Sequence, residues 1–265
     1  MKCVIHGSGG VGGYYGGCLA RAGHEVFFIA RGAHLEAIQQ QGLSIKSAKG
    51  DFRIETPKSG ERCDPNFDPD LVIVAVKSWQ LPEITEEIKN YCTPSTLILP
   101  LQNGADASDI LADTLGPERV LGGLTKIFSK IEAPGVINHF TGATYIGFGE
   151  YFQDPQFQNA PDSLSDRCRN LEKELDSTPG IDAEAFVDIQ KELWRKMLIF
   201  VSTSGVGTIT RTPNGVFRSI PETREMLIQL IREILIVGQA KKVNIGEDDY
   251  EWAISTIDAM APESN

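Results

Sequence analysis

A glycine-rich segment near the start of the chain, Gly7-Ser8-Gly9-Gly10-Val11-Gly12, has the spacing GxGxxG. It follows the short apolar run Cys3–His6 and opens a helical pattern that extends to Ala22. In this context the first glycine makes a tight turn, the second lets a pyrophosphate approach the backbone, and the third lets the helix pack on the strand. Free N–H groups and the helix dipole favour the phosphate charge. The segment therefore predicts a dinucleotide-binding loop; the alternative is a glycine-rich turn without a ligand.

An arginine stands where the second strand of such a fold would end. The apolar run Val26–Ala30 is followed directly by Arg31. NAD-binding sites usually place Asp or Glu here, about 20 residues past the glycines, on the ribose 2′-hydroxyl. A carboxylate would repel the 2′-phosphate of NADP, whereas a guanidinium can bind it with two N–H groups. We therefore expect NADP(H) rather than NAD(H); the alternative is an ordinary solvated arginine.

Polar residues follow two further apolar runs. Leu71–Val76 ends in Lys77-Ser78-Trp79-Gln80, and Leu97–Leu101 ends in Gln102-Asn103-Gly104. In a doubly wound sheet, ligands bind outside the carboxyl ends of the strands, so both groups are predicted to lie at the edge of the cofactor. Lys77 is a candidate donor to cofactor or substrate, and Asn103 would place an amide beside the nicotinamide. The alternatives are a solvated lysine at a helix start and a plain turn.

A lysine in the later part of the chain has an apolar setting. On a helix, Lys196 borders a stripe made of Leu193, Ile199 and Phe200. Partial desolvation would lower the pKa of this lysine and suit it to proton transfer near neutrality. The alternative is an exposed lysine that pairs with Glu192, and spacing alone favours that alternative.

The elements that position these residues alternate between strands and helices in the first part of the chain. Buried strands are predicted at Cys3–His6, Val26–Ala30, Leu71–Val76 and Leu97–Leu101, and helices at Val11–Ala22, Ala33–Gln41, Leu81–Tyr91 and Ala105–Leu115. This alternation predicts an α/β fold with a doubly wound parallel sheet covered on both faces. Val136–Thr141 and Ala143–Gly149, split by Gly142, predict a β-hairpin, and the polar stretch Tyr151–Asp162 predicts a surface loop.

The chain then changes character. A helix over Ser163–Leu175 and a strand over Ala183–Val187 are followed almost only by helical patterns, at Ile189–Ser204, Pro221–Val243 and Asp248–Met260. Gly205 and Gly207 punctuate the first of these patterns, and Pro213-Asn214-Gly215 predicts a turn. We therefore predict two domains, with the α/β sheet in residues 1–187 and a smaller, all-helical domain in residues 188–265.

Composition and charge exclude several classes of protein. The 265 residues are 41% hydrophobic and 23% charged, which provides a core and excludes disorder as the main state. No apolar run approaches the ~18–20 residues that a membrane-spanning helix needs. A net charge of −11 without a Lys/Arg cluster argues against nucleic acid as a partner. The apolar run after Met1 stops at His6, too early for a signal peptide, so we expect a cytoplasmic protein.

The cysteines and histidines predict neither disulfides nor a metal site. The five cysteines are widely spaced and form no CxxC, so we expect five reduced thiols. His24, His34 and His139 are isolated, and His6 ends a strand. None has a partner at the spacing of metal ligands, so we interpret all four histidines as structural.

Taken together and in order, these motifs resemble those of the ketopantoate reductase (2-dehydropantoate 2-reductase) family. The matching pieces are the glycine segment at residues 7–12, Arg31, Val76-Lys77-Ser78-Trp79-Gln80, Gln102-Asn103-Gly104, Glu192-Leu193-Trp194-Arg195-Lys196 and Pro213-Asn214-Gly215. The resemblance spans nearly the whole chain. It implies an NADP-binding Rossmann domain, then a helical domain like that of 6-phosphogluconate dehydrogenase, with the site in the cleft between them.

The resemblance also implies roles for individual residues. Lys196 matches the general acid that protonates the ketone oxygen while NADPH delivers hydride to C2 of a small 2-oxo acid. Asn103 matches a residue at the nicotinamide and substrate. The matches for cofactor contacts are Arg31, Lys77 and Gln80, and the match for a substrate contact is Asn214. The implied activity is that of an oxidoreductase acting on CH–OH groups, in pantothenate and coenzyme A biosynthesis.

The chain departs from the family pattern in two places. The family has asparagines one and two turns after the catalytic lysine, where this chain has Phe200 and Ser204; of these we expect Ser204 to contact the substrate. The family also continues past Asn265 with helices that carry further substrate-binding groups. A reductase of another, more apolar 2-oxo acid, or a non-catalytic NADP-binding protein, is therefore also compatible with the sequence. The sequence leaves the oligomeric state open, and a homodimer through the helical domain is one arrangement it allows.

Overall fold

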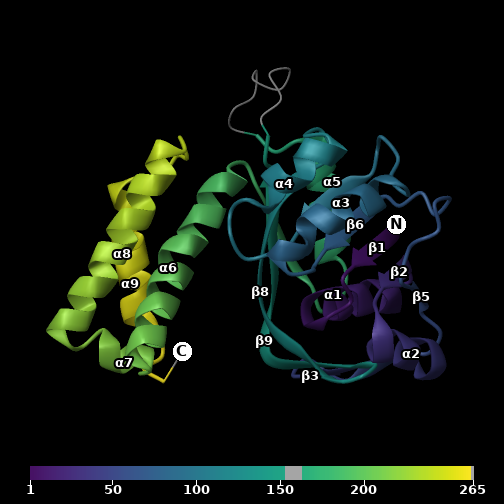
Figure 1. Cartoon of the computed structure of the whole chain (residues 1–265), viewed down its shortest axis with the longest axis horizontal. Helices are drawn as coiled ribbons and strands as arrows, with labels where there is room; N and C mark the ends of the chain where they lie inside the picture. Colours follow the sequence, from purple (N-terminus) through teal and green to yellow (C-terminus); the bar gives the residue numbers. More distant parts are fainter. Residues whose placement is uncertain (153–162, 264–265) are drawn as a thin grey trace. The chain divides into compact units, whose positions relative to one another are not determined.

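The computed structural model describes residues 1–152 and 163–263 of the chain (Figure 1). The chain divides into two compact units, unit 1 (Met1–Ile189) and unit 2 (Gln190–Asn265). The predicted surface loop at Tyr151–Asp162 lies, from residue 153 onward, outside the described residues.

Unit 1 is built on a five-stranded parallel sheet with the strand order β5-β2-β1-β6-β7. The strands are β1 (Lys2–His6), β2 (Glu25–Ile29), β5 (Lys58–Gly60), β6 (Leu71–Val74) and β7 (Leu97–Pro100). Side chains alternate along each strand, so Cys3 and Ile5 face one buried cluster while Val4 faces another. Burial on both faces explains why β1, β2, β6 and β7 read as apolar runs, whereas the short edge strand β5 does not. The predicted doubly wound α/β sheet is confirmed.

Helices cover both faces of this sheet. They are α1 (Gly10–Arg21), α2 (Gly32–Gln41), α3 (Leu81–Lys89) and α4 (Ala107–Leu115), with a 3₁₀ turn, η1, at Ser78–Gln80. The four predicted helices are therefore present, with small shifts at their ends. Helices α3 and α4 pack on the Val4 face, and α1 packs on the Ile5 face.

A second sheet lies against the other side of α1. Its strand order is β10-β9-β3-β4, and β8 pairs with β9. The strands are β3 (Leu43–Ser47), β4 (Phe52–Ile54), β8 (Leu121–Ala133), β9 (Val136–Glu150) and β10 (Asp182–Phe186). Helix α1 contacts β1 and β2 on one side and β3, β4, β8 and β9 on the other. Helix α5 (Asp166–Asp176), capped by the hydroxyl of Ser165, packs beside β10.

The predicted hairpin was wrong in its position. Val136–Thr141 and Ala143–Gly149 belong to the single strand β9, and the actual hairpin partner is β8, which the sequence analysis did not predict. The turn is at Gly135, whose φ is +74°. Gly142 lies where the register between β8 and β9 shifts, between the pairs Ile127–Thr144 and Ser129–His139. An isolated glycine inside a strand pattern marked an irregularity in pairing here, rather than a turn.

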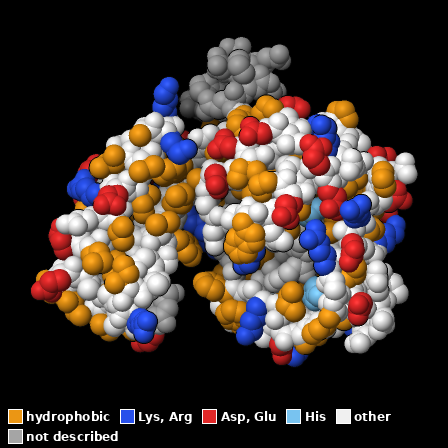
Figure 2. Space-filling model, viewed as in Figure 1, with side chains coloured by type: hydrophobic (Ala, Val, Ile, Leu, Met, Phe, Trp, Pro, Cys, Tyr) orange, Lys and Arg blue, Asp and Glu red, His pale blue; other side chains and the backbone are white. Residues whose placement is uncertain are grey.

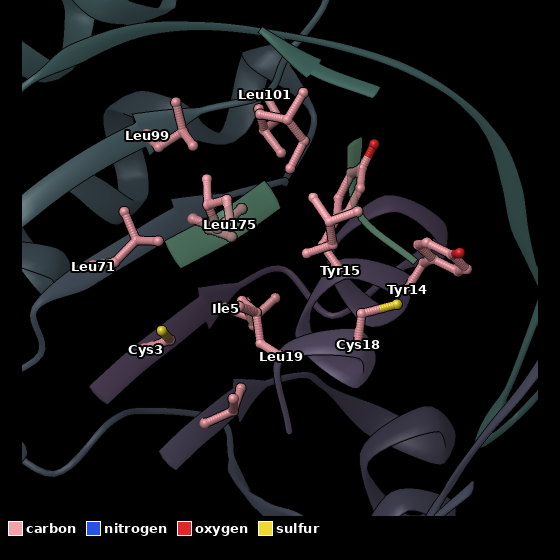
Figure 3. Packing of buried hydrophobic residues seen from close by; sticks show 14 of the residues in the cluster. Cys3, Ile5, Tyr14, Tyr15, Cys18, Leu19, Leu71, Leu99, Leu101 and Leu175 are labelled. Atoms are coloured by element: carbon pink, nitrogen blue, oxygen red, sulfur yellow. The ribbon is translucent and has the colours of Figure 1, made fainter. Parts of the chain in front are cut away.

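The position of α1 between two sheets explains its unusual glycine content. A Cβ at Gly16 would lie 2.6 Å from Ile5, and a Cβ at Gly13 would lie 2.9 Å from Ile137 of the second sheet. Figure 3 shows the side chains of β1 and α1, among them Ile5 and Leu19, meeting in this interior. Each glycine lowers helix propensity by about 1 kcal/mol relative to alanine, but it allows close packing on both sides.

Unit 2 consists of helices in the part of it that the structure describes. They are α6 (Ile189–Thr210), α7 (Asn214–Phe217), α8 (Pro221–Ala240) and α9 (Glu247–Ala259). Helix α6 continues through Gly205 and Gly207 beyond its predicted end, and the predicted turn at Pro213 leads into α7. A Cβ at Gly207 would lie 3.5 Å from Phe217, an ordinary van der Waals distance, so the packing of α6 does not itself require glycine there.

Three further features bear on the sequence-based expectations. All five cysteines are free thiols, as predicted. Among the described residues, no helix has the length and apolar character to cross a membrane, and no cluster of three or more His, Cys, Asp or Glu side chains could hold a metal. On the face shown in Figure 2, acidic and basic side chains are interspersed over both units.

Candidate functional site

The glycine loop connects β1 to α1, and two of its three spaced glycines, Gly7 and Gly12, have a steric reason within the chain. Gly7 has φ +103°, and a Cβ there would lie 2.8 Å from the side chain of Val76. A Cβ at Gly12 would lie 2.3 Å from the Gly7 carbonyl oxygen and 2.8 Å from Ile5. Around Gly9, by contrast, no heavy atom of the described chain lies within 4 Å of such a Cβ. The loop is therefore tight at both ends and open in the middle, where a ligand can approach the backbone.

The N-terminus of α1 presents unused hydrogen-bond donors. Gly9 is the N-cap residue, and within the described chain no side chain caps the helix and no acidic residue lies in its first turn. The N–H groups of a first helical turn have no intrahelical acceptor, and the helix dipole adds partial positive charge. The hydroxyl oxygen of Ser8 is also buried without a partner among the described residues. An open cradle with free donors fits the pyrophosphate of a dinucleotide, for which residues 7–12 were predicted.

Two arginines, Arg31 and Arg62, follow neighbouring strands at this edge of the sheet. Ile29 of β2 pairs with Gly60 of β5, and the Ala30 N–H donates to the Gly60 carbonyl at 3.1 Å. Two residues beyond that pair, the parallel strands deliver Arg31 and Arg62 to the same edge, and both residues are exposed. Arg62 was missed by the sequence analysis because β5 is only three residues long and was not predicted.

The charges of these arginines shift the pKa values of groups on neighbouring elements. Burial raises the pKa of Glu87, on α3, while the charges of Arg62 and Arg31 oppose that rise. Burial, together with the charge of Arg31, lowers the pKa of His6 to about 4. The His6 ring lies 3.0 Å from the Tyr91 hydroxyl and is buried, which agrees with a structural interpretation of this histidine.

The segment after β6 holds Lys77 and Gln80 in a closed turn. The Lys77 N–H donates to Gln80 Oε1 at 3.1 Å, and the Gln80 N–H donates to the Lys77 carbonyl at 2.9 Å. The Lys77 side chain is exposed and Gln80 is half-buried. The turn thus fixes the backbone at Lys77 and leaves its ammonium group on the surface of the strand-end edge.

Gln102 links the segments that follow β6 and β7. Its side-chain amide donates to the carbonyls of Val74 at 3.0 Å and Val76 at 3.1 Å, and its Oε1 is buried without a partner among the described residues. Asn103 follows directly and is exposed, before Gly104 with φ +111°. The role of Gln102 could not be predicted from the sequence, because a glutamine buried against backbone carbonyls has the same place in the motif as an exposed one.

Lys196 and Ser204 lie on one side of α6 in unit 2. Lys196 is half-buried, and its Nζ lies 5.3 Å from the centre of the Phe200 ring, which is 45% exposed. Ser204 is exposed, and its hydroxyl donates to the Phe200 carbonyl. Of the predicted apolar stripe beside the lysine, Leu193 and Ile199 are buried, whereas Phe200 is exposed. The lowered pKa expected for Lys196 stays a prediction.

The residues before Lys196 hold α6 against its neighbours. Arg195 Nη1 donates to Glu192 at 3.0 Å, and Arg195 Nε donates to Asp249 of α9 at 2.6 Å. The Trp194 ring packs on α8, where a Cβ at Gly238 would lie 2.8 Å from it. Glu192 therefore has Arg195 as a partner, and the motif that carries Lys196 is largely structural.

Asn214 is placed differently from the other candidate side chains. It begins α7, is 3% exposed, and its Nδ2 lies 3.1 Å from Met260 Sδ. Its predicted contact with a substrate stays a prediction. In unit 1, by contrast, the parallel strands bring the predicted cofactor residues to one edge of the sheet; they are the loop at residues 7–12, Arg31, Lys77, Gln80 and Asn103.

Two family models match the chain. The model described as ketopantoate reductase PanE/ApbA matches residues 3–151, and the model of its C-terminal region matches residues 188–265. An uncharacterized oxidoreductase of Bacillus subtilis, YkpB, is 32% identical over 265 residues, which cover 98% of this chain and 82% of that protein.

Solved structures share the fold of the chain. The 2-dehydropantoate 2-reductase from Porphyromonas gingivalis superposes with a TM-score of 0.85 at 27% identity, over 98% of this chain and 89% of that chain. A D-mandelate dehydrogenase, solved with NADH and anilino(oxo)acetate, has a TM-score of 0.82 at 22% identity, over 100% of this chain and 81% of that chain. At that lower identity the likeness concerns the fold.

Proposed function

Because the chain belongs to the ketopantoate reductase family of oxidoreductases, which act on CH–OH groups, we propose that it reduces ketopantoate to pantoate with NADPH. This reaction serves pantothenate and coenzyme A biosynthesis. The observation that supports the proposal is the strand-end edge of unit 1, where an open glycine loop follows β1 and an arginine follows each of the neighbouring strands β2 and β5. A dinucleotide with an additional phosphate matches that combination.

The preference for NADPH over NADH rests on Arg31 together with Arg62. Arg31 occupies the position that this fold uses for the ribose of the cofactor. Arg62 follows the neighbouring strand β5, and the charges of both arginines act on Glu87. We expect Arg31→Asp to weaken the binding of NADPH far more than the binding of NADH. Arg62→Gln should weaken NADPH binding in the same way, but by a smaller factor. The matched control is Arg169→Gln on α5, where the arginine pairs with Asp166 at the surface. Equal NADPH affinity in the wild type and Arg31→Asp would remove this part of the proposal.

The catalytic step assigns separate tasks to Lys196 and Asn103. When bound, NADPH supplies the hydride that reduces C2 of the 2-oxo acid. Lys196 holds a proton on Nζ and transfers it to the ketone oxygen as negative charge develops there, which completes the 2-hydroxy acid. A positioned acid of this kind contributes ~10²–10⁴-fold. Asn103 orients the nicotinamide and the substrate through its amide, and Ser204 and Asn214 are proposed to contact the substrate.

A second candidate is the reduction of another, more apolar 2-oxo acid. The observation that favours it is the exposed ring of Phe200 beside Lys196, at a position where the family pattern has a polar residue. An aromatic surface there would stabilise a hydrophobic substituent on C2 better than the hydroxyl-bearing chain of ketopantoate.

The test is the oxidation of NADPH by purified protein with ketopantoate, compared with the aryl 2-oxo acid benzoylformate. Faster turnover of ketopantoate supports the first proposal, and faster turnover of benzoylformate replaces it with the second. Tight NADPH binding without turnover of any 2-oxo acid would contradict both and leave a binding protein.

A further inference from the structure

His34, in the first turn of α2, makes hydrogen bonds to two backbone groups that are far apart in the sequence. Its Nε2 lies 2.9 Å from the carbonyl oxygen of Ser8 in the glycine loop. Its Nδ1 lies 3.0 Å from the backbone nitrogen of Gly135, at the turn between β8 and β9. The side chain is half-buried, so these bonds are partly shielded from water.

The two partners fix the protonation of the ring. A backbone N–H can only donate, so Nδ1 accepts from Gly135 and carries no proton. Nε2 must then carry the single proton of the neutral ring and donate it to the Ser8 carbonyl. Burial lowers the pKa of His34, while the bond to Ser8 opposes that change. Both nitrogens of the neutral imidazole are therefore satisfied.

The bond to Ser8 determines which way the next N–H points. The peptide between Ser8 and Gly9 is planar and trans, so its C=O and N–H point in opposite directions. Because the carbonyl points at His34, the Gly9 N–H points away from it. The Ser8 N–H is held as well, by the Ile29 carbonyl at 2.9 Å. The loop therefore cannot turn this peptide over without losing a hydrogen bond.

The second partner of His34, Gly135, is held in place by the second sheet. Gly135 has φ +74°, and its carbonyl accepts from the Ser44 N–H of β3 at 2.9 Å. A Cβ at Gly10 would lie 2.5 Å from the Ser129 carbonyl of β8, so the same hairpin also contacts the start of α1. The glycine loop is thus supported from a sheet outside the parallel one.

We propose that His34 is a positioning residue for the cofactor loop, holding the Ser8–Gly9 peptide so that the Gly9 N–H is directed toward the bound pyrophosphate. This rests on the proposed function, because it requires a dinucleotide at the loop. His34 itself does not touch the cofactor in this arrangement; it acts through the backbone of Ser8.

The experiment uses three variants and NADPH titration, followed by fluorescence without substrate. The amide nitrogen of His34→Gln can replace Nε2 and keep the bond to Ser8, whereas the amide oxygen of His34→Asn can replace Nδ1 and keep only the bond to Gly135. We expect the NADPH Kd to rise about three- to tenfold, the effect of one hydrogen bond, in His34→Ala and His34→Asn. His34→Gln should bind NADPH like the wild type, and kcat at saturating NADPH should be unchanged in all three.

Thermal unfolding and a second histidine serve as controls. His24→Ala removes a ring that contacts the N-terminus at 3.0 Å, away from the loop, and should leave the Kd unchanged. Unchanged binding in His34→Ala and His34→Asn would overturn the inference, and so would equal weakening in His34→Gln with a lowered melting temperature. A wild type that bound no NADPH would overturn the proposed function as well, so the two failures are distinguishable.

Discussion

In unit 1 the backbone places the candidate cofactor residues, whereas in unit 2 the candidate acid is one side chain on a helix that its neighbours hold in place. Gly7, Gly9 and Gly12 act through the absence of a side chain, and parallel pairing fixes their surroundings. Lys196 is placed by helix α6, and the contacts of Trp194 with α8 and of Arg195 with α9 hold that helix in position.

This difference determines what a substitution does in each unit. A Cβ added at the tight positions of the glycine loop meets backbone atoms that cannot move aside, so folding and binding fail together. A change at Lys196 leaves the buried contacts of α6 intact, so chemistry and stability separate.

The largest effect is expected for Gly12→Val. A Cβ there would lie 2.3 Å from the Gly7 carbonyl, so the helix must shift away from β1. Overpacking of this kind lowers the free energy of unfolding by about 3 kcal/mol at its upper range. An equal loss in the free energy of binding would raise the NADPH Kd about 100-fold. Thermal unfolding and NADPH titration would measure the two effects.

Gly9→Ala is the matched control for that prediction. Gly9 has φ −75°, which alanine adopts readily, and its Cβ would meet no heavy atom of the described chain within 4 Å. We expect an unchanged melting temperature and weaker NADPH binding, because the methyl group occupies the space where the pyrophosphate approaches. A Gly12→Val protein that melted and bound like the wild type would contradict the steric account.

In unit 2 we expect Asp249→Asn to affect stability but not cofactor binding. Asp249 has a nearly buried side chain that accepts from Arg195 at 2.6 Å and from the Gly246 N–H at 2.9 Å. Loss of the charge should cost about 1–3 kcal/mol, measured by urea unfolding. Asp258→Asn on the same helix removes a pair with Arg224 that is much more exposed, and should cost about 0–1 kcal/mol. Equal effects of the two variants would contradict the structural role of Asp249.

The pH dependence of stability follows from the same carboxyl group. Burial alone would raise the pKa of Asp249, but bonds from Gly246 and Arg195 hold it below its ordinary value. Because the folded pKa is the lower one, this contribution is complete above the unfolded value of about 3.9 and is lost as the pH falls through the folded value. The difference in free energy of unfolding between the wild type and Asp249→Asn should therefore shrink toward zero as the pH falls below the folded pKa of Asp249.

The residues at the cofactor edge could be predicted from the sequence better than the residues that hold this edge in place. The residues at strand ends could be read from apolar runs, since parallel strands leave a sheet at the same edge. Arg62, Gln102 and His34 could not be assigned, because their partners depend on register and on a second sheet. The hairpin was misplaced because Gly142 marks a register shift. The burial of Asn214 depends on Met260, which lies far along the chain.

The smallest effect is expected for Phe200→Asn, which changes substrate choice. An amide one turn after Lys196 should favour the hydroxyl-bearing ketopantoate over benzoylformate by about tenfold in kcat/KM, within the range for one pocket contact. Val201→Asn is the matched control, since Val201 is 44% exposed at the adjacent position of α6. An unchanged ratio of kcat/KM in Phe200→Asn would show that this ring does not face the substrate.

The separation of binding and chemistry between the two units is tested most directly with Lys196→Ala. NADPH is titrated first, and the hydride step is then followed in a single turnover with the preferred 2-oxo acid. We expect an unchanged NADPH Kd and melting temperature, and a hydride step slower by ~10²–10⁴-fold, with Lys191→Ala on the same helix close to the wild-type rate. A hydride step at the wild-type rate in Lys196→Ala would contradict the assignment of Lys196 as the acid.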